Sequence, residues 1–300
     1  MKKIIVFVAI LIVLAASYMN RTRISDVVDE MQKPDLPVAK EFQVSSDKLQ
    51  VEEKEDNKNS DVQDTVVESP SNIDTGIDDK IDTLVNTPPR NDKEEKPASS
   101  IPVEYNLAVP FQPQAPHANW SLPYAEACEE TSLIMADRFF NNKGLSASEA
   151  DEEIKKLVEW EKKELGYYED TSAKEVVKIA KEYFGFNVEL DYDVSVANIK
   201  QHLANNKVII VPASGRQLGN PYFTGEGPVY HMLVIRGYTK DKFITNDPGT
   251  KRGEEFLYSY GTLINAIHDW PLETGGDRQE INQKTVETGD KVLIVVGKQL

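Results

Sequence analysis

Apolar residues recur along residues 101–300 with two periods, helical in the first half and strand-like in the second. Intervals of three and four predict amphipathic helices at 123–142, 146–165, 172–184 and 195–204. Runs rich in β-branched residues predict strands at 207–213, 229–238, 241–246, 255–258 and 291–296, with a brief helix at 262–268. Helices that precede an antiparallel sheet make an α+β domain.

Serine residues mark three of the predicted helix starts. Ser146 with Glu149, and Ser172 with Glu175, have the spacing of a capping box, in which each residue bonds to the backbone of the other. Ser121 is the predicted cap of the first helix.

Lys2 and Lys3 precede an uncharged apolar run at 4–16. This pattern is typical of a signal peptide, and the run is shorter than the roughly 20 apolar residues that span a bilayer. Residues 1–19 are therefore predicted to be a signal peptide or a short membrane anchor. We expect an exported, extracytoplasmic protein, either secreted or tethered to the cell membrane through the uncleaved segment.

Residues 20–100 contain a single aromatic residue, Phe42, and more acidic than basic side chains. This composition predicts a disordered acidic linker. All three tryptophans lie in 101–300, which is predicted to be one domain. The net charge of −16 argues against a nucleic-acid partner.

Cys128 is the sole cysteine of the chain, which excludes an internal disulfide and a cysteine-based zinc site. It falls in the first turns of the predicted helix, where the helix dipole favours a thiolate, the nucleophilic form. Glu129 and Glu130 would raise the thiol pKa if their side chains pointed at it. A buried structural cysteine is the alternative.

His231 opens an apolar strand after a loop rich in glycine and proline. A hairpin that turns near 239–240 would place His231 opposite Asp247, whose carboxylate could fix the tautomer of the imidazole. Asn246 is an alternative partner in a shifted register. A purely structural histidine at a strand end is the other interpretation.

Gln114 lies in an extended, proline-rich segment upstream of Cys128. Its amide N–H is a candidate donor to an oxyanion, together with the backbone N–H of Cys128. Gln112 is the rival position, and a surface glutamine without a catalytic role is the alternative.

The order of these residues resembles that of papain-like cysteine peptidases. More closely, the chain resembles the bacteriocin-leader-processing peptidases and their stand-alone exported relatives, the C-thirty-nine-like peptidases. The matching stretches are VPFQPQ (109–114), ACEETS (127–132), HMLVIRGY (231–238) and NDPGT (246–250). The resemblance implies a papain-like fold, with N-terminal helices packed on an antiparallel sheet.

The resemblance also implies roles for four residues: Gln114 as oxyanion donor, Cys128 as nucleophile, His231 as base and Asp247 as orienter. It implies hydrolysis of peptide bonds in a peptide or protein substrate, without a metal or cofactor. Two features depart from the family. Glu129 stands where the family often has glycine. The interval from Gln114 to Cys128 is wider than in the leader-processing peptidases.

The expected function is that of an exported or membrane-tethered cysteine peptidase that uses a Cys-His-Asp triad and an acyl-enzyme. One alternative is a catalytically silent papain-like module that binds peptides or cell wall. Another is an amidase of peptidoglycan stem peptides, and a transglutaminase-like acyl transfer is a third. The oligomeric state stays open.

Overall fold

The computed structural model describes residues 34–43, 101–271 and 282–299. In these residues the strands form one sheet in which every pairing between neighbouring strands is antiparallel, in the order β2-β7-β3-β4-β5-β6, and β1 pairs with β4. The strands are β1 (Tyr105–Asn106), β2 (Asn187–Asp191), β3 (Val208–Ser214), β4 (Tyr230–Tyr238), β5 (Lys242–Asn246), β6 (Phe256–Ser259) and β7 (Leu293–Gly297).

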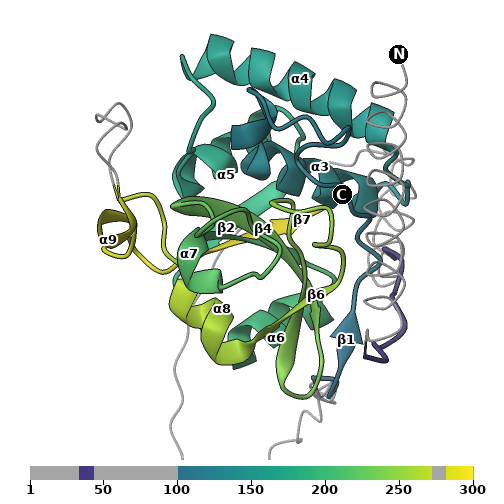
Figure 1. Cartoon of the computed structure of the whole chain (residues 1–300). Helices are drawn as coiled ribbons and strands as arrows, with labels where there is room; N and C mark the ends of the chain where they lie inside the picture. Colours follow the sequence, from purple (N-terminus) through teal and green to yellow (C-terminus); the bar gives the residue numbers. More distant parts are fainter. Residues whose placement is uncertain (1–33, 44–100, 272–281, 300) are drawn as a thin grey trace, which may run out of the picture. The chain divides into compact units, whose positions relative to one another are not determined.

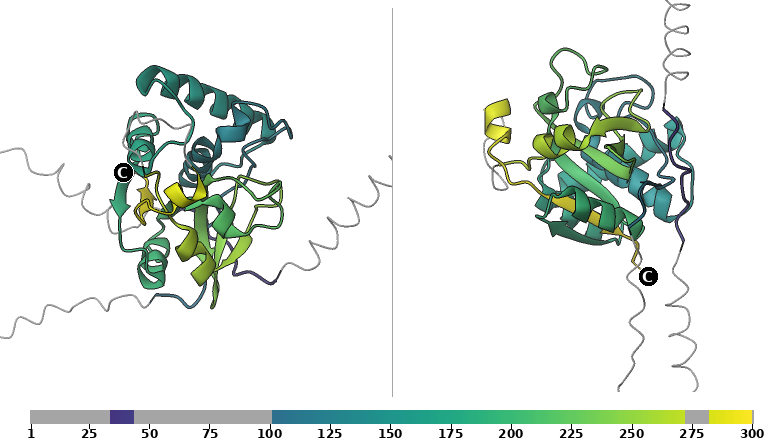
Figure 2. Two further views of the ribbon diagram at one scale, coloured as in Figure 1. Left: turned by 60° about the vertical axis from the view of Figure 1, so that its left-hand side comes forward. Right: turned by 90° about the horizontal axis from the view of Figure 1, so that it is seen from below.

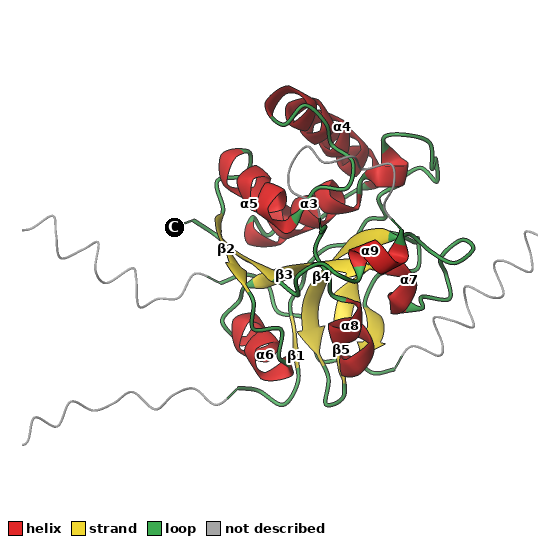
Figure 3. Ribbon diagram, turned by 90° about the vertical axis from the view of Figure 1, so that its left-hand side faces the viewer, coloured by secondary structure: helices red, strands yellow, loops and turns green. Residues whose placement is uncertain are grey.

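Helices cover both faces of this sheet, with α3, α4 and α5 on one side and α6 on the other (Figure 3). The helices are η1 (Tyr124–Glu126), α3 (Cys128–Phe140), α4 (Ala147–Glu164), α5 (Ala173–Glu182), α6 (Val196–Ala204), α7 (Gly215–Leu218), α8 (Tyr260–Ala266) and α9 (Gln283–Val286). The α+β prediction is confirmed, and the five predicted strands and the five predicted helices are all present. The predictions missed β1, β2, α7 and α9.

Helix starts agree with the predicted caps where a side chain makes the cap. Ser146 and Ser172 each complete a capping box, at the starts of α4 and α5. The prediction was wrong for the first helix, because a separate 3₁₀ turn, η1, precedes α3. The N-cap of α3 is Ala127, whose side chain accepts no hydrogen bond, and Ser121 does not cap it. Cys128 is therefore the first residue of α3.

The core lies where α3 packs on the central strand. All nine residues of β4 are buried, so both faces of this strand are covered. Most of α3 is also buried, including the polar residues Glu129, Glu130, Thr131 and Ser132. Cys128 at the start of α3 and His231 near the start of β4 thus project from two deeply packed elements, which fixes their positions.

The predicted register of the β4–β5 hairpin, with His231 directly opposite Asp247, was wrong. Val234 pairs with Asn246, and the register shifts again at a bulge between Ile235 and Gly237. The ladder partner of His231 is Ala213 on β3. Asp247 follows the last residue of β5, so it reaches His231 through its side chain and not through strand pairing.

The 34–42 segment runs along the domain beside β1 (purple in Figures 1 and 2). The Lys40 N–H donates to the Asn106 carbonyl, and the Lys40 carbonyl accepts from the Ala108 N–H. Phe42 meets the rings of Phe139 and Phe140 edge-on, at centroid distances of 5.7 and 5.2 Å. Part of the span predicted as a linker therefore packs against the domain.

Replacing Phe42 with alanine is expected to lower the free energy of unfolding by about 1–2 kcal/mol, because it removes a half-buried ring and two edge-on aromatic contacts. Urea denaturation of the full chain measures this change. Val38→Ala is the matched control, since Val38 lies in the same segment and is 87% exposed. Equal stabilities for the two variants would show that Phe42 does not hold the segment in place.

The predicted signal peptide or anchor at 1–19, and most of the predicted linker at 20–100, lie outside the described residues. No helix within the described ranges is long and apolar enough to cross a membrane. The predictions of export and of a linker therefore stay predictions.

Candidate active site

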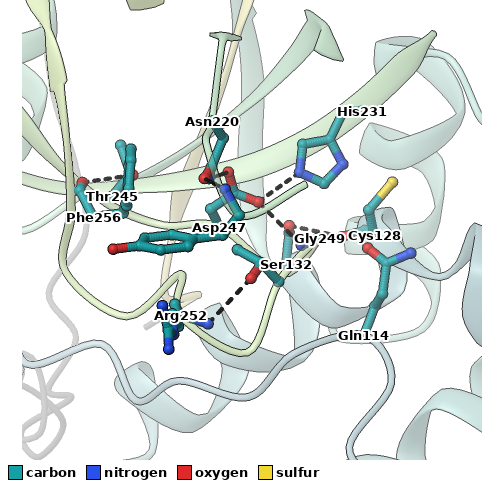
Figure 4. Close-up of polar contacts among 12 residues, drawn as sticks. Gln114, Cys128, Ser132, Asn220, His231, Thr245, Asp247, Gly249, Arg252 and Phe256 are labelled. Atoms are coloured by element: carbon teal, nitrogen blue, oxygen red, sulfur yellow. Dashed lines mark hydrogen bonds and ion pairs between the residues drawn. The ribbon is translucent and has the colours of Figure 1, made fainter. Parts of the chain in front are cut away.

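Cys128 lies at the N-terminus of α3 and is 7% exposed. The first N–H groups of a helix have no intrahelical acceptor and carry partial positive charge, so they can stabilise an anion beside the sulfur. Figure 4 shows the sulfur on the side of the His231 ring. The structure thus brings the two residues of the predicted nucleophile–base pair together.

His231 is held by Asp247 in a fully buried contact. The distance from His231 Nε2 to Asp247 Oδ1 is 2.8 Å. The other ring nitrogen, Nδ1, lies toward Cys128 in Figure 4. With Nε2 donating its proton to the carboxylate, Nδ1 is the acceptor, which is the tautomer that a general base beside a thiol requires.

Four donors surround the Asp247 carboxylate. His231 Nε2 and the Gly249 N–H point at Oδ1, while the Tyr258 hydroxyl and the Asn220 amide donate to Oδ2 at 2.6 and 3.0 Å. Burial alone would raise the pKa of Asp247, but attraction to His231 and these hydrogen bonds outweigh it and hold the pKa below its ordinary value. Asp247 is therefore ionised at neutral pH.

Two neighbours restrict the imidazole further. The ring of Phe223 meets the His231 ring edge-on at a centroid distance of 5.5 Å. On another side lies Gly249, where a Cβ atom would be only 2.9 Å from His231 Cε1. A side chain at 249 would thus displace the ring, and glycine lets the backbone after Asp247 approach it closely.

The electrostatic environment of the thiol differs from the sequence-based expectation. Cys128 Sγ donates a hydrogen bond to Glu129 Oε2 at 3.0 Å. Burial, and then the Glu129 and Glu130 carboxylates, raise the pKa of the Cys128 thiol well above its ordinary value. Burial and the Glu129 contact thus oppose the helix N-terminus, which favours the thiolate.

Gln114 lines the same cleft as Cys128 and His231. Its amide nitrogen donates to the carbonyls of Tyr124 and Ala125, both at 3.0 Å. Its amide oxygen is buried and has no hydrogen-bond partner among the described residues. The predicted proximity is present, while the role of the amide as an oxyanion donor stays a prediction.

Gln112 and Asn246, the alternatives to Gln114 and Asp247, bind partners other than His231. The Gln112 amide donates to the Leu145 carbonyl. Asn246 accepts from the Arg236 guanidinium and donates to the carbonyls of Val109 and Pro110. Asn246 thus ties β4 and β5 to the segment that carries Gln114, and Asp247 is the residue that holds His231.

The cleft around these residues has a volume of about 810 Å³. Glu126 and Asp170 lie on its lining with Trp120, which is 45% exposed, and so do Lys251 and Arg252. No group of three or more His, Cys, Asp or Glu side chains in the described parts of the chain could hold a metal ion.

Comparison with known proteins identifies the family of the chain. The model of the Peptidase_C39 like family matches residues 106–270, which is more than half of the chain and includes every residue of the site. The chain belongs to this family. No curated protein matches the chain. A solved structure described as a C39-like peptidase from Bacillus anthracis aligns with a TM-score of 0.38 and 16% identity, covering 64% of this chain and 96% of that one.

Membership of the Peptidase_C39 like family implies a peptide substrate and confirms the resemblance seen in the motifs. It does not identify the residues that hold Asp247 and His231 in place. Asn220 and Tyr258, which hold Asp247, and Phe223, which packs on His231, were missed by the sequence analysis. Asn220 precedes a proline in a loop, and Tyr258 lies in an ordinary apolar strand, so neither carries a local signal of its role.

Proposed function

We propose that this protein is an exported or membrane-tethered cysteine peptidase that cleaves peptide bonds through Cys128, His231 and Asp247. The observation that carries the proposal is the oriented imidazole: Asp247 binds Nε2 at 2.8 Å and leaves Nδ1 on the side of the Cys128 sulfur. A histidine with only a structural role has no need of a four-donor carboxylate behind it and a thiol in front.

In the proposed reaction the Cys128 proton passes to His231 Nδ1 as the sulfur attacks the carbonyl carbon of the substrate. His231 then protonates the leaving amine, and the peptide bond breaks to leave a thioester on Cys128. Water, deprotonated by His231, hydrolyses the thioester and restores the thiol. Asp247 remains ionised throughout and stabilises the imidazolium.

The developing oxyanion would be bound by the Cys128 N–H at the start of α3 and by the Gln114 amide. The amide nitrogen of Gln114 now contacts the Tyr124 and Ala125 carbonyls. It must direct one N–H from these carbonyls to the oxyanion, which is an interaction made only with bound substrate.

A binding module without catalysis is the second candidate, and one observation favours it. The Cys128 thiol donates to Glu129, and its pKa is raised. A thiol held in this way is a poor nucleophile. The two candidates therefore differ in whether the proton can leave Cys128 for His231.

Incubating the full chain with casein, and separately with muropeptides, tests the proposed function. We expect new peptide termini in casein, with turnover lost after alkylation of the thiol by iodoacetamide. Cleavage of muropeptides alone would move the assignment to the stem-peptide amidase. Binding of either substrate without any cleavage would favour the silent module.

Fractionation of cells that express the full chain would test export, with the protein expected outside the cytoplasm.

A further inference from the structure

Three buried acidic side chains lie near the Cys128 thiol. Glu129 and Glu130, on the first turn of α3, are 1% and 0% exposed, and Glu161 on α4 is 0% exposed. One oxygen of Glu129 accepts the Cys128 thiol proton at 3.0 Å. Its other oxygen, Oε1, has no hydrogen-bond partner among the described residues. Glu161 is close enough to Glu130 to raise the pKa of its carboxyl group.

No basic side chain is among the groups that act most strongly on Glu129 and Glu130. Burial and neighbouring acids raise the pKa of each of these carboxyls well above its ordinary value. Cys128 and Glu129 are thus two acids in contact inside the protein, and a negative charge on one makes ionisation of the other unfavourable. The pair holds one proton more readily than none.

The Glu129 carboxylate competes with His231 for the proton of the Cys128 thiol. While Glu129 is a carboxylate, the thiol points its proton at Oε2, and a thiolate would add a second buried negative charge. Once Glu129 takes a proton from solvent, its O–H can donate to the sulfur. The thiol proton is then free to move to His231 Nδ1, which leaves a thiolate beside an imidazolium.

We propose that Glu129 is a positioning residue that withholds the Cys128 proton from His231, so that the thiolate–imidazolium pair forms only when Glu129 is protonated. This inference rests on the proposed function, because it takes Cys128 as the nucleophile. It makes the activity of the thiol fall as the pH rises through the titration of Glu129. The titratable groups that face the pair come from η1, α3, α4, the loop after α4, and β4: Glu126, Glu130, Glu161, Asp170, Tyr230 and His231.

The rate of Cys128 alkylation by iodoacetamide between pH 5 and 9 tests this inference in the full chain. The chain has one cysteine, so the mass increase reports this thiol alone. We expect Glu129→Gln to react at least tenfold faster than the wild type at pH 7.5 and to lose the decline toward alkaline pH. Glu130→Gln, which removes a neighbouring buried carboxyl that does not contact the sulfur, is expected to change the rate less than threefold.

Two outcomes would overturn the inference: Glu129→Gln reacting at the wild-type rate, or both glutamine variants accelerating equally. A loosened fold would also expose the thiol, so Glu129→Gln is combined with His231→Ala. The acceleration must disappear in the double variant if it comes from the thiolate–imidazolium pair, and its persistence would refute the inference. The proposed function fails separately, if His231→Ala alone leaves the rate and pH profile of the wild-type thiol unchanged.

Discussion

Replacing Cys128 with alanine is expected to abolish peptide hydrolysis, with a loss in kcat of at least about 10⁴-fold. Removing a nucleophile that acts as one unit with its base leaves only the catalysis supplied by binding and oxyanion stabilisation. The side chain starts α3 in the cleft that also holds His231 and Gln114, and it is the single thiol of the chain. Initial rates on a cleaved peptide, measured at matched protein concentrations, test this prediction.

Cys128→Ser is the matched variant. Its hydroxyl can replace the hydrogen bond that the thiol donates to Glu129, so the packing beneath the cleft is kept. We expect the two variants to unfold within a few degrees of the wild type and to bind the peptide as the wild type does. Undiminished turnover in the alanine variant would refute the assignment of the nucleophile. Peptide binding equal to that of the wild type, in a wild type that itself shows no turnover, would identify the silent binding module.

The parts of the fold that could be predicted are those with a local cause. The serine–glutamate boxes at Ser146 and Ser172 set the starts of α4 and α5 through contacts three residues apart. The start of α3 has no such cause, since Ala127 offers no cap and η1 ends just before it. The first residue of α3 depends on how this buried helix packs, and a pattern of apolar residues does not predict that packing.

The contact of the 34–42 segment with the domain also has no local cause in the sequence. Phe42 is the single aromatic residue of a long acidic stretch, and its partners Phe139 and Phe140 lie about a hundred residues away in the sequence. Composition describes the average of such a stretch and not one short segment within it. The missed strand β2 is a similar case, because its partner β7 lies about a hundred residues further along the chain.

In the site, the prediction that His231 meets Asp247 was right although the register behind it was wrong. The Val234–Asn246 pairing places Gly249, and not Asp247, nearest to a position opposite His231. Asp247 still reaches Nε2 because the backbone turns after β5 and the side chain spans the remaining distance. The direction of the Glu129 side chain could not be predicted at all, and after burial it contributes most to the raised pKa of the thiol.

Replacing Asp247 is expected to separate two effects, the loss of an acceptor and the loss of a charge. Asp247→Ala removes the acceptor for His231 Nε2, so the imidazole loses its orientation and its fixed tautomer. We expect kcat/KM to fall by roughly 10²- to 10⁴-fold.

Asp247 also contributes to the pH dependence of stability, because its pKa is lowered in the folded protein. Its ionised form stabilises the fold at pH values above the ordinary pKa of 3.8, and this contribution is lost as the pH falls through the lowered pKa.

Asp247→Asn is expected to cost much less, because the surrounding donors dictate how the amide is oriented. The Gly249 N–H cannot rotate away from Oδ1, so the amide oxygen must face Gly249 and His231. The amide nitrogen then points at the Tyr258 hydroxyl, which can rotate to accept a hydrogen bond, and at the Asn220 amide, which loses Oδ2 as an acceptor. His231 keeps its tautomer with a neutral acceptor in place of a charged one, a loss of about 1–1.5 kcal/mol or roughly tenfold in kcat/KM.

Nitrogen-15 chemical shifts of the His231 ring, measured together with kcat/KM, distinguish these cases. The asparagine variant should retain the proton on Nε2, and the alanine variant should show a mixture of tautomers. Tyr258→Phe is the control, since it removes one donor to Oδ2 and leaves Oδ1 bound to His231. It should lower kcat/KM by no more than about threefold, because Oδ1 keeps its contacts with His231 and Gly249 and Asn220 still donates to Oδ2. If asparagine and alanine at 247 proved equally damaging, the negative charge of Asp247 would be the property that His231 requires, and its acceptor geometry would not be.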